Sequence, residues 1–194
     1  QPSYLACAQG VILLSGSRIV GGEGITNTGA ATAMQIKGDE HIHYYYYAFD
    51  STSGETVWTT DHATTLRVDG GHGEYNRHPT IVGETVYAWP YAYHVKTGQR
   101  IEGWTFDRQG HGCGGISASA HGLFWRGGNP WLYDLRPGGG SHRITSVTRP
   151  GCWINMLAVG GLIVIPEADA GCTCGFPIQT SLALAPLKRG QTTN

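Results

Sequence analysis

The chain has 194 residues, enough for one domain that buries roughly 70% of the surface of its unfolded chain. Charged residues make up 14% and the formal net charge is −1, so the sequence offers no electrostatic attraction to nucleic acid or to an anionic membrane. No apolar run approaches the ~20 residues that a membrane span requires. We therefore expect neither nucleic-acid binding nor a membrane span.

Short apolar runs, separated by turn residues, predict β-strands from the start of the chain. The first unit has predicted strands at 3–9, 11–15, 41–50 and 55–60. Aromatic and β-branched residues flank the turn pair Ser53-Gly54, as in a hairpin. Between the second and third strands, Gly16–Glu40 is rich in Gly, Thr and Asn and predicts a long functional loop. Cys7, inside the first strand, is expected to be a buried small hydrophobe.

The same pattern continues to the end of the chain. A second loop is predicted at Asp61–Asn76, and a third insertion at 167–180. The remaining predicted strands are 78–83, 85–90, 91–96 and 100–106 in the second unit, 115–120, 122–126, 131–135 and 142–148 in the third, and 154–159, 161–166 and 181–187 in the fourth. Pro and Gly interrupt every candidate helix, so we expect an all-β fold.

Parts of the sequence recur at intervals of 40 to 50 residues. The stretch Tyr44–Trp58 returns in degraded form as Ala92–Trp104 and again, more weakly, as Leu132–Gly138. Four-stranded meanders with such a period are typical of β-propeller blades. We expect one propeller segment over 1–194, with blades at approximately 1–60, 61–108, 109–148 and 149–194.

The motif in the first repeat is Ala48-x-Asp50-x-x-x-Gly54-x-x-x-Trp58, and it resembles the pyrroloquinoline-quinone-like repeat of quinoprotein dehydrogenases and bacterial envelope scaffolds. The second repeat matches at Ala92, Thr97, Gly98 and Trp104, with a two-residue insertion and His94 in place of the Asp. More loosely, the segment from Arg149 through Cys174 to Pro186 resembles the C-terminal part of envelope propellers from planctomycete-type bacteria.

The resemblance implies a ring of seven or eight blades, of which this chain supplies about four. We therefore expect a fragment, or a partner chain or missing chain segment that completes the ring, because unpaired sheet edges invite association. The family's quinone site requires adjacent cysteines and a complete ring. Neither is found in this sequence, which argues against pyrroloquinoline quinone as a cofactor.

Four of the five cysteines are predicted to gather on one face of the propeller. Cys113 and Cys152 each precede the turn glycine of their hairpin by nine residues, and Cys172 and Cys174 lie in the 167–180 insertion. One interpretation is a pair of disulfides, which an oxidising compartment would allow. The other is a thiolate site for zinc or copper(I), with His111 as a further ligand; free thiols are the third alternative. The chain also begins at Gln1 rather than Met, and we expect a periplasmic or extracellular protein.

Histidines form two further candidate sites. His72, Tyr75, Arg77 and His78 fall within nine residues and could provide general acid–base chemistry, such as β-elimination of a uronic-acid polysaccharide. In a strand, His41 and His43 would lie on one face and could ligate a metal. Each set also has a structural interpretation: a loop satisfying its own backbone, or histidines on a strand surface.

The sequence favours a non-catalytic binding or scaffold module of the bacterial cell envelope, with a face rich in Cys and His that binds a partner, a polysaccharide or a small polar ligand. The alternative is a metal-dependent oxidoreductase or polysaccharide lyase that uses the same residues. No cofactor is assigned, and zinc and copper are the metals that the cysteines would accept.

Overall fold

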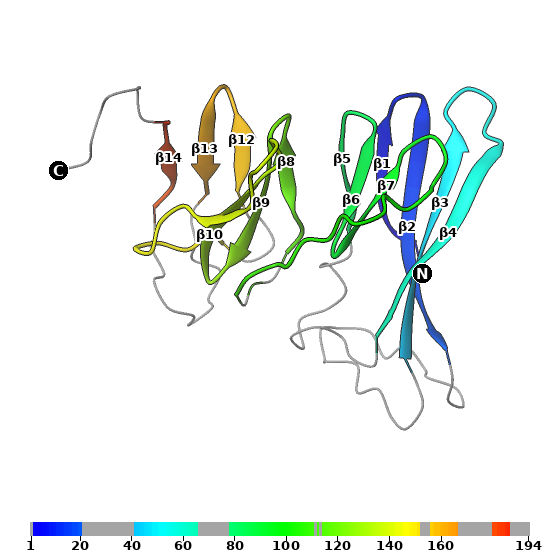
Figure 1. Cartoon of the computed structure of the whole chain (residues 1–194), viewed down its shortest axis with the longest axis horizontal. Helices are drawn as coiled ribbons and strands as arrows, with labels where there is room; N and C mark the ends of the chain where they lie inside the picture. The colour runs from blue at the N-terminus through cyan, green and yellow to red at the C-terminus, as the bar shows by residue number, and fades with distance from the viewer. Residues whose placement is uncertain are drawn as a thin grey trace. The chain divides into compact units, whose positions relative to one another are not determined.

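The computed structural model describes residues 2–20, 41–65, 78–110, 112, 114–151, 156–166 and 180–186. These residues form four antiparallel sheets of three or four strands and contain no helix, as Figure 1 shows. The all-β prediction is confirmed for this part of the chain. None of it forms a helix of the length and apolar character needed to cross a membrane. Two compact units, Gln1–Asp107 and Arg108–Asn194, hold two sheets each.

The first unit contains two meanders in which each strand pairs with the next. The first sheet consists of β1 (Pro2–Ala8), β2 (Val11–Val20), β3 (His41–Asp50) and β4 (Thr56–Thr65), and the second sheet of β5 (Thr80–Val82), β6 (Thr85–Ala88) and β7 (Tyr91–His94). Gln9 and Gly10 join β1 to β2 with φ angles of 54° and 74°. Two successive positive φ angles are what a tight two-residue hairpin requires.

The second unit repeats this arrangement. The third sheet consists of β8 (Ser117–Ser119), β9 (Gly122–Gly127), β10 (Asn129–Asp134) and β11 (Ser141–Arg143), and the fourth sheet of β12 (Leu157–Val159), β13 (Leu162–Ile165) and β14 (Leu182–Leu184). The strands agree with the predicted ones to within a few residues at most ends.

The core of each unit lies between its two sheets. In the first unit, Leu13 and Ala48 of the first sheet are buried in the same cluster as Val86 and Ala88 of the second. In the second unit, Phe124 of the third sheet packs with Ile165 of the fourth. Successive side chains of a strand point to opposite faces, so burial alternates in β2, where Val11, Leu13 and Ser15 are buried, whereas residues 122–126 of β9 are buried on both faces.

Within each unit, the two sheets meet through their first strands. β1 contacts β5, and β8 contacts β12. The hydroxyl of Ser117 in β8 also donates a hydrogen bond to the carbonyl of Met156, which directly precedes β12.

A second contact joins the outer strands of the first unit. The Trp58 indole of β4 donates a buried hydrogen bond of 2.9 Å to the Val95 carbonyl, which follows β7. The same ring packs against Gly98, where an added Cβ would lie 2.5 Å from the ring atom Cδ2. Gly98 has a φ of 67°, so both its conformation and its neighbour require glycine.

The turns after β3 and β7 are closed by the same pair of backbone hydrogen bonds. After β3, Asp50 N–H donates to the Glu55 carbonyl and Gly54 N–H donates to the Asp50 carbonyl. After β7, His94 N–H donates to the Gln99 carbonyl and Gly98 N–H donates to the His94 carbonyl. Asp50 and His94 therefore occupy equivalent positions, as the sequence alignment predicted.

The predicted strand at 100–106 is wrong as a continuous strand. Arg100 makes one bridge with Tyr93, a turn follows at Glu102–Gly103, and Phe106 N–H then returns to the Pro90 carbonyl. The reason is the two-residue insertion of this repeat. Two extra residues cannot keep the register beside β7, so the chain bulges outward, and Gly103 takes a φ of 70°.

Two predicted loops begin later than the sequence suggested. Gly16–Val20 and Asp61–Thr65 belong to β2 and β4, and their backbones pair with β3. The long, tyrosine-rich β3 supplies ladder partners on both sides, so the flanking strands extend along it.

Candidate functional site

Most of the predicted site residues lie outside the described part of the chain. They are His72, Tyr75, Arg77, His111, Cys113, Cys152, Cys172 and Cys174, together with the side chain of His41. The predicted cysteine cluster and most of the histidine loop therefore stay predictions. His43 and His78 can be placed.

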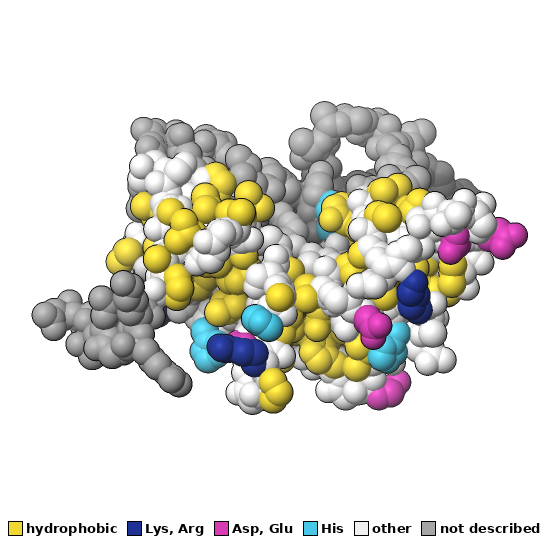
Figure 2. Space-filling view, turned by 90° about the horizontal axis from the view of Figure 1, so that it is seen from above, with side chains coloured by type: hydrophobic (Ala, Val, Ile, Leu, Met, Phe, Trp, Pro, Cys, Tyr) yellow, Lys and Arg dark blue, Asp and Glu magenta, His cyan; other side chains and the backbone are white. Residues whose placement is uncertain are grey.

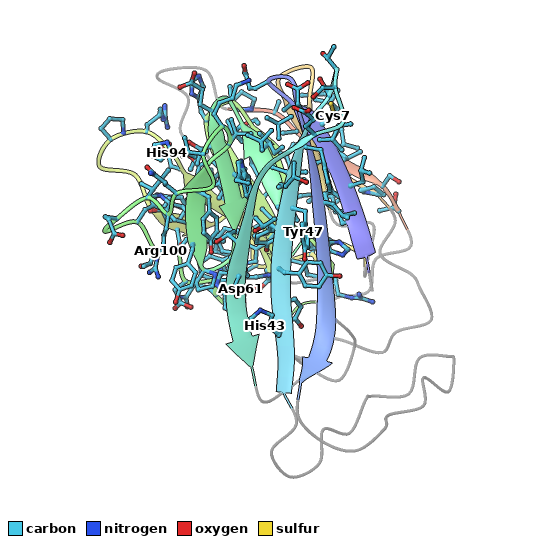
Figure 3. The ribbon with its side chains drawn as sticks, turned by 90° about the vertical axis from the view of Figure 1, so that its right-hand side faces the viewer. Cys7, His43, Tyr47, Asp61, His94 and Arg100 are labelled. Carbon is cyan, nitrogen blue, oxygen red and sulfur yellow. The ribbon has the colours of Figure 1, made fainter. Side chains whose placement is uncertain are left out.

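His43 is paired with a carboxylate on the neighbouring strand. Its Nε2 lies 2.7 Å from Oδ1 of Asp61, and the two side chains are 16% and 72% exposed (Figure 3). The pairing arises because Asp61 of β4 stands opposite Tyr45, two positions along β3 from His43. The described residues contain no group of three or more His, Cys, Asp or Glu side chains that could hold a metal. Metal binding at His41 and His43 stays a prediction.

His78 stacks on an aromatic ring of the first strand. The ring centroids of His78 and Tyr4 are 4.9 Å apart, with an interplanar angle of 20°. This stacking joins the residues before β5 to β1, beside the contact between those two strands. His78 therefore has a packing role in the first unit. Its catalytic role stays a prediction.

His62 is a buried side chain that the sequence placed in a loop. It lies in β4, where Tyr44 pairs with Ala63 and Tyr45 pairs with Asp61, so His62 is the extra residue of a β-bulge. His62 continues the alternation that buries Trp58 of the same strand, and it is 6% exposed. The sequence prediction ended this strand at residue 60, so it missed this position.

Both ring nitrogens of His62 have partners in the second sheet. Nε2 lies 3.0 Å from the Trp89 carbonyl oxygen and Nδ1 lies 2.7 Å from the Tyr93 hydroxyl. A carbonyl can only accept, so Nε2 carries the proton of the neutral ring and Nδ1 accepts from the Tyr93 hydroxyl. The imidazole therefore links β4 to β7 and to the turn between β6 and β7.

Aromatic rings surround this hydrogen-bonded pair. The rings of Tyr46, Tyr91 and Tyr93 lie 5.0, 5.8 and 5.7 Å from the His62 ring, and the Arg100 guanidinium lies 3.6 Å from the Tyr91 ring centroid. Burial raises the pKa of Tyr93 to about 12, because the phenolate would lose its hydration. At neutral pH the Tyr93 hydroxyl therefore keeps its proton and can donate it to His62.

Cys7 is exposed, so the prediction of a buried Cys7 is wrong. Ala6 pairs with the buried Leu13, whereas Cys7 pairs with Ile12, whose side chain lies on the opposite face of the sheet. Strand alternation therefore directs the thiol away from the core. Its residue type alone could not indicate which of the two faces it would take.

Two aspartates close turns at the end of the third strand of their sheets: Asp50 at the end of β3 and Asp134 at the end of β10. The backbone N–H groups of Ser53 and Thr52 donate to the Asp50 carboxylate and lower its pKa. The Arg136 guanidinium bonds to Asp134 and holds the pKa of that carboxyl well below its usual range. Both carboxylates accept hydrogen bonds from backbone N–H groups of the turns that follow them.

Comparison with protein-family models and with curated proteins finds no match to this chain.

Proposed function

We propose that this chain is a segment of a β-propeller that acts as a non-catalytic binding or scaffold module of the bacterial cell envelope. The observation that carries the proposal is the contact of β1 with β5 and of β8 with β12. A propeller is built from four-stranded meanders placed around a central channel, so contacts between the first strands of successive meanders support this proposal. The pyrroloquinoline-quinone-like repeat is the family that the motifs resemble.

The contact of Trp58 in β4 with the residues that follow β7 supports the same proposal. Trp58 and Gly98 occupy the Trp and Gly positions of successive copies of the motif, and they pack against one another. The equivalent turns at Asp50 and His94 support a structural repeat in the same way. A repeat in which each sheet is held by its neighbours is the usual basis of propellers and solenoids.

The chemistry of the described histidines supports a binding or scaffold role over catalysis. His62 links two sheets, and His78 stacks on Tyr4. Both rings therefore have packing functions that explain their presence without a reaction. We propose that a polysaccharide, a small polar ligand or a partner protein binds on the face that carries the predicted cysteines, and that the module is periplasmic or extracellular.

The oxidation state of the cysteines and the metal content test this proposal together. The full chain, exported to a bacterial periplasm and purified without reductant, is alkylated under denaturing, non-reducing conditions. We expect peptide mass spectrometry to find the label on Cys7 and disulfides at the four other cysteines, with no stoichiometric metal. One tightly held zinc or copper per chain, with alkylated Cys113 or Cys152 after its removal, would instead favour a metal-dependent oxidoreductase or lyase.

A further inference from the structure

The first sheet has an apolar face directed away from its core. The side chains that stand opposite one another across β1, β2 and β3 form two rows, Leu5–Leu14–Tyr47 and Cys7–Ile12–Phe49. Leu5 is 63% exposed and Tyr47 36%, and Figure 3 views the sheet from this side. We call these six residues the first-sheet face.

The second sheet identifies what covers such a face. Because Asp50 is equivalent to His94, Phe49 and Tyr47 correspond to Tyr93 and Tyr91. Strand register then makes Ile12 and Leu14 correspond to Val86 and Ala88. Val86 and Ala88 are fully buried and Tyr93 is 3% exposed, because the first sheet packs on them. The same positions are therefore covered by a neighbouring sheet in one repeat, whereas in the other Tyr47 is exposed and Ile12, Leu14 and Phe49 are only half-buried.

The fourth sheet has the complementary exposed face. Its hairpin pairs Val159 with Leu162 as the first sheet pairs Ala8 with Val11, so Leu162 and Val164 correspond to Val11 and Leu13. Val11 and Leu13 are buried against the second sheet, whereas Leu162 is 37% exposed. Leu157 and Val159 share this face and are 52% and 58% exposed. Figure 2 shows apolar side chains at the surface of both units.

We infer that the first-sheet face binds the exposed face of the fourth sheet in a second copy of this chain. The inference rests on the proposed function, because it treats the two faces as those of consecutive propeller sheets. One chain carries both halves of the contact, so two copies can satisfy each other. Such a head-to-tail contact gives a closed dimer if the rotation closes and a longer assembly if it does not.

The test is sedimentation of the full chain over a wide range of concentrations, with charged substitutions at exposed positions. Tyr47→Glu alters the first-sheet face and Val159→Glu the fourth-sheet face. Val147→Glu is the matched control, since Val147 is 71% exposed and follows β11 outside both faces. We expect self-association of the native chain and of the control, and its loss in each of the other variants. A mixture of Tyr47→Glu and Val159→Glu chains should associate again, because one intact contact remains between them.

Cys7 provides a readout that needs no substitution. Its exposed thiol lies on the first-sheet face, so its alkylation rate should fall as the native chain associates. A monomer at every concentration, with a constant rate at Cys7, would overturn the inference and leave the scaffold proposal intact. Protection of Cys7 by added oligosaccharide in a monomeric chain would overturn it in favour of a sugar as the occupant.

Discussion

At the scale of single residues, the most informative side chain is His62, which the extension of β4 beyond residue 60 places in the core. Its two nitrogens reach the Trp89 carbonyl and the Tyr93 hydroxyl, so one imidazole bonds both to β7 and to the turn that precedes it. A buried polar group of this kind stabilises the fold when it is fully paired and destabilises it when one partner is removed.

Tyr93→Phe should therefore lower the free energy of unfolding by about 1–3 kcal/mol, because it leaves the Nδ1 acceptor of His62 buried without its donor. Denaturation in urea at neutral pH measures this difference. Tyr47→Phe is the control, since that phenol is 36% exposed and its removal should change stability by less than about 0.5 kcal/mol. Equal effects of the two substitutions would contradict the assigned hydrogen bond.

The same tyrosine should make the fold sensitive to alkali. Its pKa is raised from 10.0 to about 12 in the folded chain, so the unfolded chain releases this proton first. The contribution of the raised Tyr93 pKa to the free energy of unfolding is complete below pH 10 and is lost as pH rises through about 12. Unfolding free energies measured across this range should fall with pH, and the fall should be smaller in Tyr93→Phe. Parallel curves for the two proteins would show that another group is responsible.

At the scale of the elements, two turns with the same backbone geometry differ in what surrounds their glycine. Gly54 and Gly98 have φ angles of 74° and 67°, but an added Cβ at Gly54 would meet nothing within 4 Å, whereas at Gly98 it would meet the Trp58 ring. The pair thus separates the cost of a left-handed conformation from the cost of steric overlap.

Gly54→Ala should lower the free energy of unfolding by about 1 kcal/mol, the cost of placing alanine at positive φ. Gly98→Ala carries the same cost and in addition displaces the Trp58 indole, so its loss should be larger by about 1–3 kcal/mol. Fluorescence of Trp58 should change in Gly98→Ala and not in Gly54→Ala. Similar losses of stability would mean that the indole moves aside at little cost.

The sequence was sufficient for most of the strands and for the two equivalent turns, because alternation and turn glycines are local signals; it missed the break of the strand at 100–106 and the full length of β2 and β4. It placed the hairpin at Asp50–Gly54 and its equivalent at His94–Gly98 correctly. It could not place His62 or Cys7. Whether a strand residue faces the core depends on register and on bulges, which are set by the pairing of distant segments.

At the scale of the whole molecule, the described residues form two units, each with a pair of sheets around its own core. The repeat period predicted this number of sheets, because each period has enough strands for one meander. The candidate sites could be predicted only as sets of chemically capable residues. The cysteines carry no sequence signal that separates a disulfide from a metal ligand, since both need the same thiolates held close together.

The packing of Trp58 on Gly98 also bears on how far such a sequence can drift. One position must stay large and flat, and the other must stay without a side chain, while the backbone N–H and carbonyl of His94 close the turn whatever its side chain is. The first position of the turn can therefore change, as the aspartate of one repeat and His94 of the other illustrate. Two sheets can remain joined long after the rest of their sequences have ceased to look alike.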